Sequence, residues 1–170
     1  MTNFRLADSS DLPQLKEIYR NIVNSMYQNN IEIWDDIYPC EFFEEDIEHN
    51  RLYILEEGKE IISAFALCSS NAGAEYVEWE KKDAKALYLD RFGVNVNYLR
   101  KGIGSIMLDK AIHQAKENGA EYLRLFVVDI NEPAQKLYIK NDFKQVEGIY
   151  DEVIDEELTL HEYGFEVVVQ

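Results

Sequence analysis

Hydrophobic residues recur along the chain with two periods, and the switches between them mark its predicted helices and strands. Apolar residues three or four positions apart predict helices, whereas short alternating or continuous apolar runs predict strands. The first part of the chain predicts, in order, a strand, a helix, a short acidic helix and two strands: 3–7, a helix capped by Ser9 or Ser10, 41–49, 51–57 and 60–69. A turn at Gly58 and Lys59 joins the last two strands into a hairpin.

The rest of the chain alternates strands and helices. It predicts a strand, a helix, a strand, a helix and two final strands: 85–94, 103–118, 122–128, 131–142, 143–150 and 158–169. Gly119 is placed to end the first of these helices, and Asn131 is placed to cap the second. Because a helix links the strand over 85–94 to the next one, we expect these two strands to be parallel. The pattern as a whole predicts an α+β mixed sheet.

Composition bounds the class of protein. The 170 residues contain no internal repeat and no linker rich in proline or glycine, so we predict one domain over residues 1–170. The hydrophobic content of 46% argues against disorder. No secretory signal is visible, and the longest apolar run is too short to cross a bilayer. Cys40 and Cys68 lack the spacing of metal ligands. We therefore expect a cytoplasmic protein with no membrane segment and no metal.

The charge distribution narrows the choice of ligands. A net charge of −16 argues against nucleic acid as a partner, because its phosphates require a basic surface. The imbalance is uneven, since residues 100–144 hold eight Lys or Arg and six Asp or Glu. An anionic ligand is expected in this near-neutral segment, whereas the acidic remainder would attract cations. We expect the acidic runs at 42–48 and 151–157 to be solvated surfaces rather than metal sites.

The stretch "LRKGIGS", residues 99–105, lies between a predicted strand and a predicted helix. Backbone N–H groups at such a helix start bind phosphate, and glycine permits a close approach. A dinucleotide fingerprint would need a third glycine where the chain has Met107, and no P-loop string is present. Two readings remain for the loop: a tight connection without a ligand, or a site for a different phosphate-bearing molecule.

Two motifs resemble the GNAT superfamily of N-acetyltransferases. The family pattern [Q/R]-x-x-G-x-[G/A] is matched by "LRKGIG", with Leu99 in place of Gln or Arg. The family pattern N-x-x-A-x-x-x-Y-x-x-x-G-F is matched by "NEPAQKLYIKNDF" over 131–143, with Asp142 in place of Gly. The segments "IEIWDDIYP" and "YVEWE" resemble an uncharacterised bacterial branch of this family.

The resemblance implies a fold and a co-substrate. It implies a GNAT-like mixed sheet flanked by helices, in which two central parallel strands splay apart, and acetyl-CoA as the acyl donor without a metal. The pantetheine arm is then expected against the backbone of Phe92, Gly93 and Val94, with an N–H near Val94 as oxyanion donor. The other residues implied to hold the coenzyme are Arg100, Lys101, Gly102, Ile103, Gly104, Ser105, Asn131 and Tyr138.

The resemblance also implies a reaction. Tyr138 occupies the motif position of a general acid that protonates the departing thiolate, although a tyrosine on an amphipathic helix can equally be a core residue. Asp90 and Arg91 adjoin the expected thioester region on the same strand. The general base stays open. Residues implied on the acceptor side are Trp34, Tyr38, Glu78 and Arg91, each of which has a plain packing or surface alternative.

Two functions stay open, one enzymatic and one limited to binding. The first is acetyl transfer from acetyl-CoA to an amine of a small molecule or peptide, with cationic amines favoured by the acidic charge. The second is a non-catalytic domain that binds or senses acyl-CoA. The C-terminal strands are candidates for pairing in a homodimer, as in much of the family, and the oligomeric state stays open.

Overall fold

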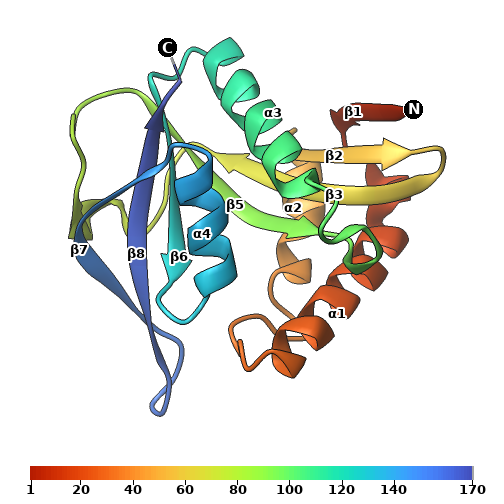
Figure 1. Ribbon diagram of the computed structural model, residues 1–170, viewed down its shortest axis with the longest axis horizontal. Coiled ribbons are helices and arrows are strands. Elements are labelled where there is room, and N and C mark those ends of the chain that lie inside the picture. The colour runs from red at the N-terminus through yellow and green to blue at the C-terminus, as the bar shows by residue number, and fades with distance from the viewer. Residues whose placement is uncertain (170) are drawn as a thin grey trace. The chain divides into compact units, whose positions relative to one another are not determined.

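The computed structural model describes residues 1–169, over which it has eight strands and four α-helices (Figure 1). The strands are β1 (Thr2–Leu6), β2 (Leu52–Glu57), β3 (Glu60–Cys68), β4 (Val77–Glu78), β5 (Ala86–Val94), β6 (Tyr122–Val128), β7 (Lys144–Val153) and β8 (Thr159–Val168). The helices are α1 (Leu12–Gln28), α2 (Phe43–Glu48), α3 (Ile103–Glu117) and α4 (Glu132–Lys140). The α+β class is thus confirmed.

The strands form a mixed sheet in the order β1-β2-β3-β5-β6-β8-β7-β4. The ladder β1–β2 is antiparallel, and so are β2–β3, β6–β8, β7–β8 and β4–β7. The pair β5–β6 is parallel, as the linking helix predicts. The chain divides into two compact units, which we call the N-terminal unit (1–67 and 91–107) and the C-terminal unit (68–90 and from 108 onward). Each unit combines two separate stretches of the sequence, and the single domain stays a prediction.

In the N-terminal unit, the first turn of α1 is fixed to the β2–β3 hairpin by one side chain, that of Gln14. The side chain of Gln14 donates to the carbonyl of Lys59 at 3.0 Å and accepts from the N–H of Ile61 at 2.6 Å. The predicted serine cap is wrong. A short 3-10 turn over Ser9–Asp11 precedes the α-helix, and Asp8 caps this turn by accepting from the N–H of Ser10. Asp11 is the N-cap residue of α1 itself, and its side chain makes no cap hydrogen bond.

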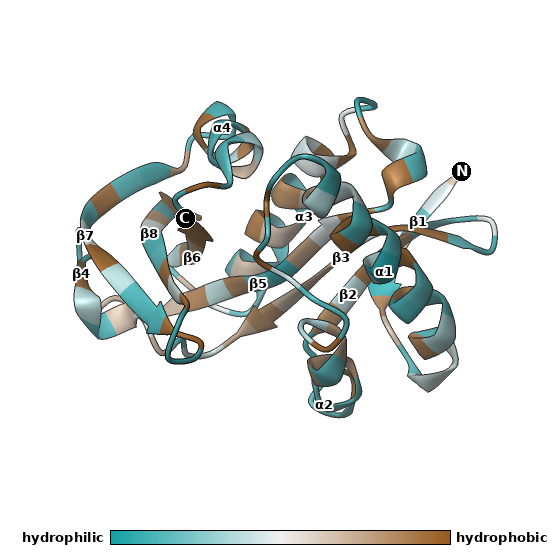
Figure 2. Ribbon diagram, turned by 90° about the horizontal axis from the view of Figure 1, so that it is seen from below, coloured by the Kyte–Doolittle hydropathy of each residue, from teal (hydrophilic) through white to brown (hydrophobic). Residues whose placement is uncertain are grey.

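In the C-terminal unit, α4 covers one face of β6 and β8 (Figure 1). The ring of Tyr138 lies 6.2 Å from that of Phe165 on β8 and 5.8 Å from that of Phe143. On the opposite face of β8, Gly164 lies under Trp79, whose ring also meets Phe126 at 5.6 Å. Figure 2 shows hydrophobic and hydrophilic residues mixed along β7, and its side chains alternate between half-buried and exposed from Tyr150 to Val153, as in a strand with one face exposed.

The parallel ladder between β5 and β6 is short. It joins the first three residues of each strand, from Ala86 opposite Tyr122 to Tyr88 opposite Arg124, and does not include Leu89 or Asp90. From Leu125 onward, β6 continues its pairing with β8 to Val128. The separation of these two strands agrees with the splayed parallel pair that the family resemblance implies.

Two acidic surfaces were expected to be solvated, and each contains an exception. Asp46, in the run 42–48, has no exposed surface. Glu152, in the run 151–157, lies on β7 and is half-buried. The strand β4 was not predicted, because a strand of two residues is too short to show a hydrophobic period.

Candidate functional site

The segment from β5 to α3 is held at its start by Asn95. The side chain of Asn95 donates to the carbonyl of Ile61 at 3.0 Å and accepts from the N–H of Asn97 at 3.0 Å. Its own N–H donates to the carbonyl of Ile62 at 2.9 Å. A buried asparagine thus fixes where the chain leaves the strand, which sets the position of the loop that follows.

The loop itself has two residues in the left-handed conformation, Arg100 (φ 63) and Gly102 (φ 76). A Cβ added at Gly102 would meet no atom within 4 Å, so the backbone conformation and not packing requires glycine here. Gly102 therefore leaves the approach to the first turn of α3 open.

The start of α3 has the electrostatics of an anion site. Its first turn contains no acidic residue, and the helix runs for 15 residues. The first N–H groups of a helix lack internal partners and carry the positive end of its dipole. Arg100 and Lys101 precede it with exposed side chains. Ile103, Gly104 and Ser105 form the turn and are half-buried.

The end of β5 is tightly packed and locally distorted. Arg91 has φ 53 within the strand, a conformation that is strained for a non-glycine residue. A Cβ at Gly93 would lie 2.9 Å from the Tyr19 ring and hydroxyl, so packing requires glycine at this position. The hydroxyl of Ser63 donates to the carbonyl of Gly93 at 2.6 Å. Phe92 and Val94 are half-buried. The backbone of Phe92–Val94 is therefore held rigidly, as a coenzyme-binding strand would need.

Arg91 forms a buried ion cluster with Asp46 on α2. Its guanidinium donates twice to the carboxylate, at 2.7 Å each, and Arg51 adds a third bond of 2.7 Å. The guanidinium also lies 5.1 Å from the ring centroid of Phe42. Arg91 thus has a structural function in the N-terminal unit, and its expected place on the acceptor side stays a prediction.

The two aromatic residues expected on the acceptor side belong to the N-terminal unit and are half-buried. The ring of Trp34 stacks on that of Tyr19 at 5.7 Å, and Tyr38 meets the edge of Phe42 at 5.5 Å. Glu78 lies in the C-terminal unit, exposed on β4 opposite Glu147.

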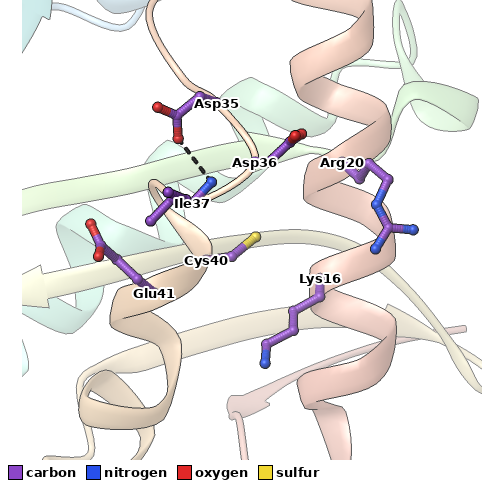
Figure 3. Close-up of a pocket in the computed structure, with 7 residues that line it drawn as sticks. All are labelled: Lys16, Arg20, Asp35, Asp36, Ile37, Cys40 and Glu41. Atoms are coloured by element: carbon purple, nitrogen blue, oxygen red, sulfur yellow. Dashed lines mark hydrogen bonds between the residues drawn. The ribbon is translucent and has the colours of Figure 1, made fainter.

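A cavity of about 600 Å³ lies beside the segment that carries these aromatics (Figure 3). Lys16 and Arg20 project from α1 on one side of it. The other side is formed by Asp35, Asp36, Ile37, Cys40 and Glu41. Burial raises the pKa of the Cys40 thiol, against the opposing influence of the two cations. A thiol of raised pKa is a weak nucleophile at neutral pH. No sequence pattern predicted this cavity.

Asn131 and Tyr138 lie at the two ends of α4. The side chain of Asn131 accepts from the N–H of Ala134 at 3.3 Å, which confirms it as the helix cap. Tyr138 is 7% exposed. Burial and, secondarily, the charge of Asp90 raise the pKa of the Tyr138 hydroxyl, so that it stays protonated at neutral pH. Asp142 ends the helix at φ 69, in the conformation that the family pattern gives to glycine.

Glu162, on β8, was missed by the sequence reasoning. It is 9% exposed, and its Oε2 atom has no hydrogen-bond partner. Burial, a hydrogen-bonded contact with Glu152 and the charge of Asp90 raise the pKa of Glu162 to about 9. The available signal was its place in the alternation of β8, on the same face as Leu160 and Gly164. An acidic residue at an inward position is unusual enough to have been noted.

The structure was also searched for metal-ligand groups and for helices long enough to cross a membrane. Within residues 1–169, no group of three or more His, Cys, Asp and Glu is placed to hold a metal ion. None of the helices in this range combines the length and apolar character that a bilayer span requires.

Comparison with known proteins identifies the family. The model of the acetyltransferase (GNAT) family matches residues 16–143, about three quarters of the chain. No curated protein sequence matches.

Solved structures share the fold over almost the whole chain. A Staphylococcus aureus Mu50 structure assigned as an acetyltransferase has 25% identity and a TM-score of 0.73, with 98% of this chain and 99% of that one covered. The yncA structure from Salmonella typhimurium, solved with its cofactor acetyl-CoA, has 16% identity and a TM-score of 0.66, with 99% and 94% covered. Arabidopsis thaliana NAA60, in complex with a bisubstrate analogue, has 18% identity and a TM-score of 0.70, with 99% and 98% covered. The chain belongs to the GNAT family of acetyltransferases and is an N-acetyltransferase.

Proposed function

We propose that this enzyme transfers the acetyl group of acetyl-CoA to an amine of a small molecule or peptide by direct attack. The observation that carries the proposal is the open first turn of α3 behind Gly102, with no acidic residue in it. Such a turn suits the coenzyme pyrophosphate. The yncA structure, which has this fold and holds acetyl-CoA, supports the choice of coenzyme.

The coenzyme would be held by backbone more than by side chains. We assign the pyrophosphate to the N–H groups of the loop and first turn, and the pantetheine arm to the end of β5. The residues of this proposed site are Phe92, Gly93, Val94, Arg100, Lys101, Gly102, Ile103, Gly104, Ser105 and Asn131. Because backbone donors supply the contacts, Leu99 in place of the family's Gln or Arg removes little of the binding.

The reaction consists of one addition and one elimination. The lone pair of the neutral amine attacks the thioester carbon, and the carbonyl oxygen becomes an oxyanion. A backbone N–H near Val94 is the proposed donor to that oxyanion. Collapse of the adduct re-forms the carbonyl, breaks the C–S bond and releases CoA as a thiolate, which takes up one proton. The amine nitrogen loses one proton to a base that stays unassigned.

Tyr138 is the proposed proton donor to the thiolate. Its buried hydroxyl stays protonated, as a general acid must be before the reaction. A thiol has a pKa near 8.5, so full transfer from a phenol of raised pKa would be uphill. We infer that the hydroxyl acts mainly in the transition state, by donating to the sulfur as negative charge develops there.

On the acceptor side we propose Trp34 and Tyr38 as wall residues. Trp34 stacks on Tyr19 and Tyr38 meets Phe42 edge-on, and these contacts give both rings fixed orientations, which supports that function. Glu78 and Arg91 stay candidates. The ion cluster of Arg91 with Asp46 supports a positioning role for Arg91 rather than direct contact with the acceptor.

The first experiment measures coenzyme binding by thermal unfolding. Acetyl-CoA at 100 times its Kd should add about 2.7 kcal/mol to the free energy of unfolding, seen as a rise in Tm. A panel of amines is then screened by release of free CoA thiol. Absence of a thermal shift with millimolar acetyl-CoA would contradict the proposal. A shift without thiol release from any amine would indicate a domain that binds acyl-CoA without turnover.

The pyrophosphate site is tested with an isosteric pair of variants. Gly102→Asn and Gly102→Asp have the same shape, and both residues tolerate a positive φ better than most. We expect Gly102→Asp to weaken acetyl-CoA binding about tenfold or more relative to Gly102→Asn, because its charge repels phosphate at short range. Equal affinities by calorimetry would remove the pyrophosphate from this turn.

The proton donor is tested with Tyr138→Phe. We expect kcat to fall about 100-fold, at the lower end of general acid catalysis, with little change in acetyl-CoA affinity. Phe143→Leu serves as a packing control, because that ring contacts Tyr138 without a hydroxyl. An unchanged kcat in Tyr138→Phe would remove the assignment.

A further inference from the structure

The end of β5 that is proposed to bind the pantetheine arm is fixed by contacts from three other elements of the N-terminal unit. The hydroxyl of Tyr19 on α1 donates to the carbonyl of Arg91 at 2.5 Å. The hydroxyl of Ser63 on β3 donates to the carbonyl of Gly93 at 2.6 Å. On α2, the carboxylate of Asp46 accepts two hydrogen bonds of 2.7 Å from the guanidinium of Arg91. Two of these contacts therefore act on the backbone of β5, and the third acts on a side chain.

The backbone of β5 has an unfavourable conformation at Arg91. Its φ of 53 is left-handed, which is strained for a residue that has a Cβ atom. Such a residue persists only where its surroundings hold it, and it bends the strand at that point. The residues that follow are Phe92, Gly93 and Val94. The orientation of the proposed coenzyme-binding backbone therefore depends on what holds Arg91.

The contact with Asp46 fixes the orientation of the Arg91 side chain as well as its position. Nε of Arg91 donates to Oδ2 and Nη2 donates to Oδ1, so two bonds join the two planar groups. The guanidinium also lies over the ring of Phe42, 5.1 Å from its centroid. Asp46 has no exposed surface and Arg91 is buried, so little water competes for these bonds. The side chain of Arg91 is thus held to one arrangement.

Stability by itself does not account for an ion pair at this place. A buried ion pair often stabilises a protein no more than apolar side chains of similar volume, because both charges must leave water. Apolar packing, however, has no preferred direction. The two-point contact between arginine and carboxylate is directional, and the ammonium group of a lysine cannot form it. The arrangement is therefore better suited to setting a geometry than to adding stability.

Asp46 also binds a cation that does not belong to β5. Arg51, directly before β2, donates from Nε to Oδ1 of Asp46 at 2.7 Å. The N–H of Arg51 donates to the carbonyl of Asp46 at 3.0 Å. Arg51 thus connects α2 to the start of β2, whereas Arg91 connects α2 to the coenzyme strand. Because both arginines donate to the same carboxylate, a comparison of the two separates the stability of α2 from the orientation of β5.

We propose that Asp46 is a positioning residue, which acts through Arg91 to orient the backbone of residues 92–94 toward acetyl-CoA. This inference rests on the proposed acetyl transfer and adds to it a residue of α2. Without the two-point contact, Arg91 is free to relax toward an extended φ. The N–H groups proposed to meet the pantetheine arm and the oxyanion then turn away from the coenzyme.

The test compares Arg91→Lys with Arg51→Lys, because Asp46→Asn is expected to be strongly destabilised. Each lysine variant keeps the charge and replaces a planar donor to Asp46 by an ammonium group. Calorimetry is carried out at a temperature at which thermal unfolding shows both variants to be folded. We expect Arg91→Lys to weaken acetyl-CoA binding about tenfold, the range of one charge-assisted contact, and Arg51→Lys to stay within about twofold of the wild type.

A second measurement follows turnover. The proposed oxyanion donor lies on the same backbone, and a small displacement of such a group lowers the rate of the chemical step. At saturating acetyl-CoA, kcat for release of CoA thiol should fall about tenfold in Arg91→Lys and stay within about twofold in Arg51→Lys. A purely structural ion pair would leave kcat of the folded, saturated enzyme unchanged.

The outcomes separate this inference from the proposed function. Equal acetyl-CoA affinities of Arg91→Lys and the wild type overturn the inference and leave the proposed function standing. Equal losses of affinity in both lysine variants also overturn it, because affinity would then follow the packing of α2. An unchanged kcat in Arg91→Lys overturns it as well. If the wild type does not bind acetyl-CoA, the proposed function fails and the inference fails with it. If the wild type binds acetyl-CoA but acetylates no amine, the affinities alone decide.

Discussion

Two buried acidic residues, one in each unit, differ in whether positively charged side chains donate to their carboxyl groups. Asp46, in the N-terminal unit, has no exposed surface and accepts three bonds of 2.7 Å from Arg91 and Arg51. Glu162, in the C-terminal unit, is almost as enclosed and has an oxygen without any donor. A buried carboxylate with matched cations stays charged and ties elements together, whereas one without them keeps its proton.

Glu166 sharpens the contrast, since it lies on the same strand and face as Glu162. Its pairing with Arg124 shows that the C-terminal unit can neutralise a buried carboxylate where the structure requires it. The difference between the two glutamates is therefore a property of each site and not of the unit. Four substitutions test this interpretation.

The largest loss of stability is expected from a substitution of Asp46. Asp46→Asn removes a carboxylate held between two arginines and leaves buried positive charge, so the free energy of unfolding should fall by about 3–5 kcal/mol. Urea denaturation measures it. Glu45→Gln is the matched control, because Glu45 is exposed and 3.6 Å from the same Arg51, and it should change stability by less than about 1 kcal/mol. A loss below 1 kcal/mol in Asp46→Asn would contradict the structural role.

A somewhat smaller loss is expected on removal of Arg124. Arg124→Met keeps the apolar stem but leaves Glu166 buried without its cation, and the free energy of unfolding should fall by about 3 kcal/mol. Equilibrium unfolding in guanidinium chloride measures the change. Lys81→Met is the control, because only the Lys81 carbonyl is used and its side chain is exposed. Equal stability of the two variants would contradict the pairing.

Glu162→Gln should raise the free energy of unfolding, and the size of this increase should depend on pH. The folded protein holds the Glu162 proton up to a pKa of about 9, whereas the unfolded chain loses it near 4.3. Glu162 therefore lowers wild-type stability progressively as the pH rises between these values. The glutamine can donate to Glu152, so the variant should exceed the wild type by about 1 kcal/mol at pH 8 and by less at pH 5. Thermal unfolding at both pH values would contradict this if the variant were the less stable one at pH 8.

The smallest change in stability is expected at Asp11, in the turn that precedes α1. Burial raises the pKa of Asp11, but hydrogen bonds from Arg5 and from the N–H of Asp8 outweigh it, and the pKa is lowered. The stabilisation is present above the unfolded value near 3.9 and is lost as the pH falls below it. Asp11→Asn should lower stability by about 1 kcal/mol at pH 7, and the difference should shrink toward pH 3. A difference that does not change between these pH values would contradict the ion pair.

The local sequence pattern was enough to predict the four α-helices, seven of the eight strands and the proposed coenzyme loop. The hairpin turn at Gly58, the helix stop at Gly119 and the cap at Asn131 all depend on residues next to each other in the chain, and all three were predicted. The glycine loop is local in the same sense, because a strand, a positive φ at Gly102 and a helix start occur within a few residues. Family and fold class followed from two such local motifs.

The partners of buried charges were decided only by the tertiary structure. Asp46 and Glu152 stand in acidic runs that resemble solvated surface, and nothing near them in sequence distinguishes them from their neighbours. Asp46 is buried because Arg91, 45 residues away, reaches it. Glu162 and Glu152 lie diagonally across the β7–β8 ladder because Glu152 pairs with Leu160. The sequence determines which residues can ionise, and the long-range packing of strands and helices decides which of them meet a cation.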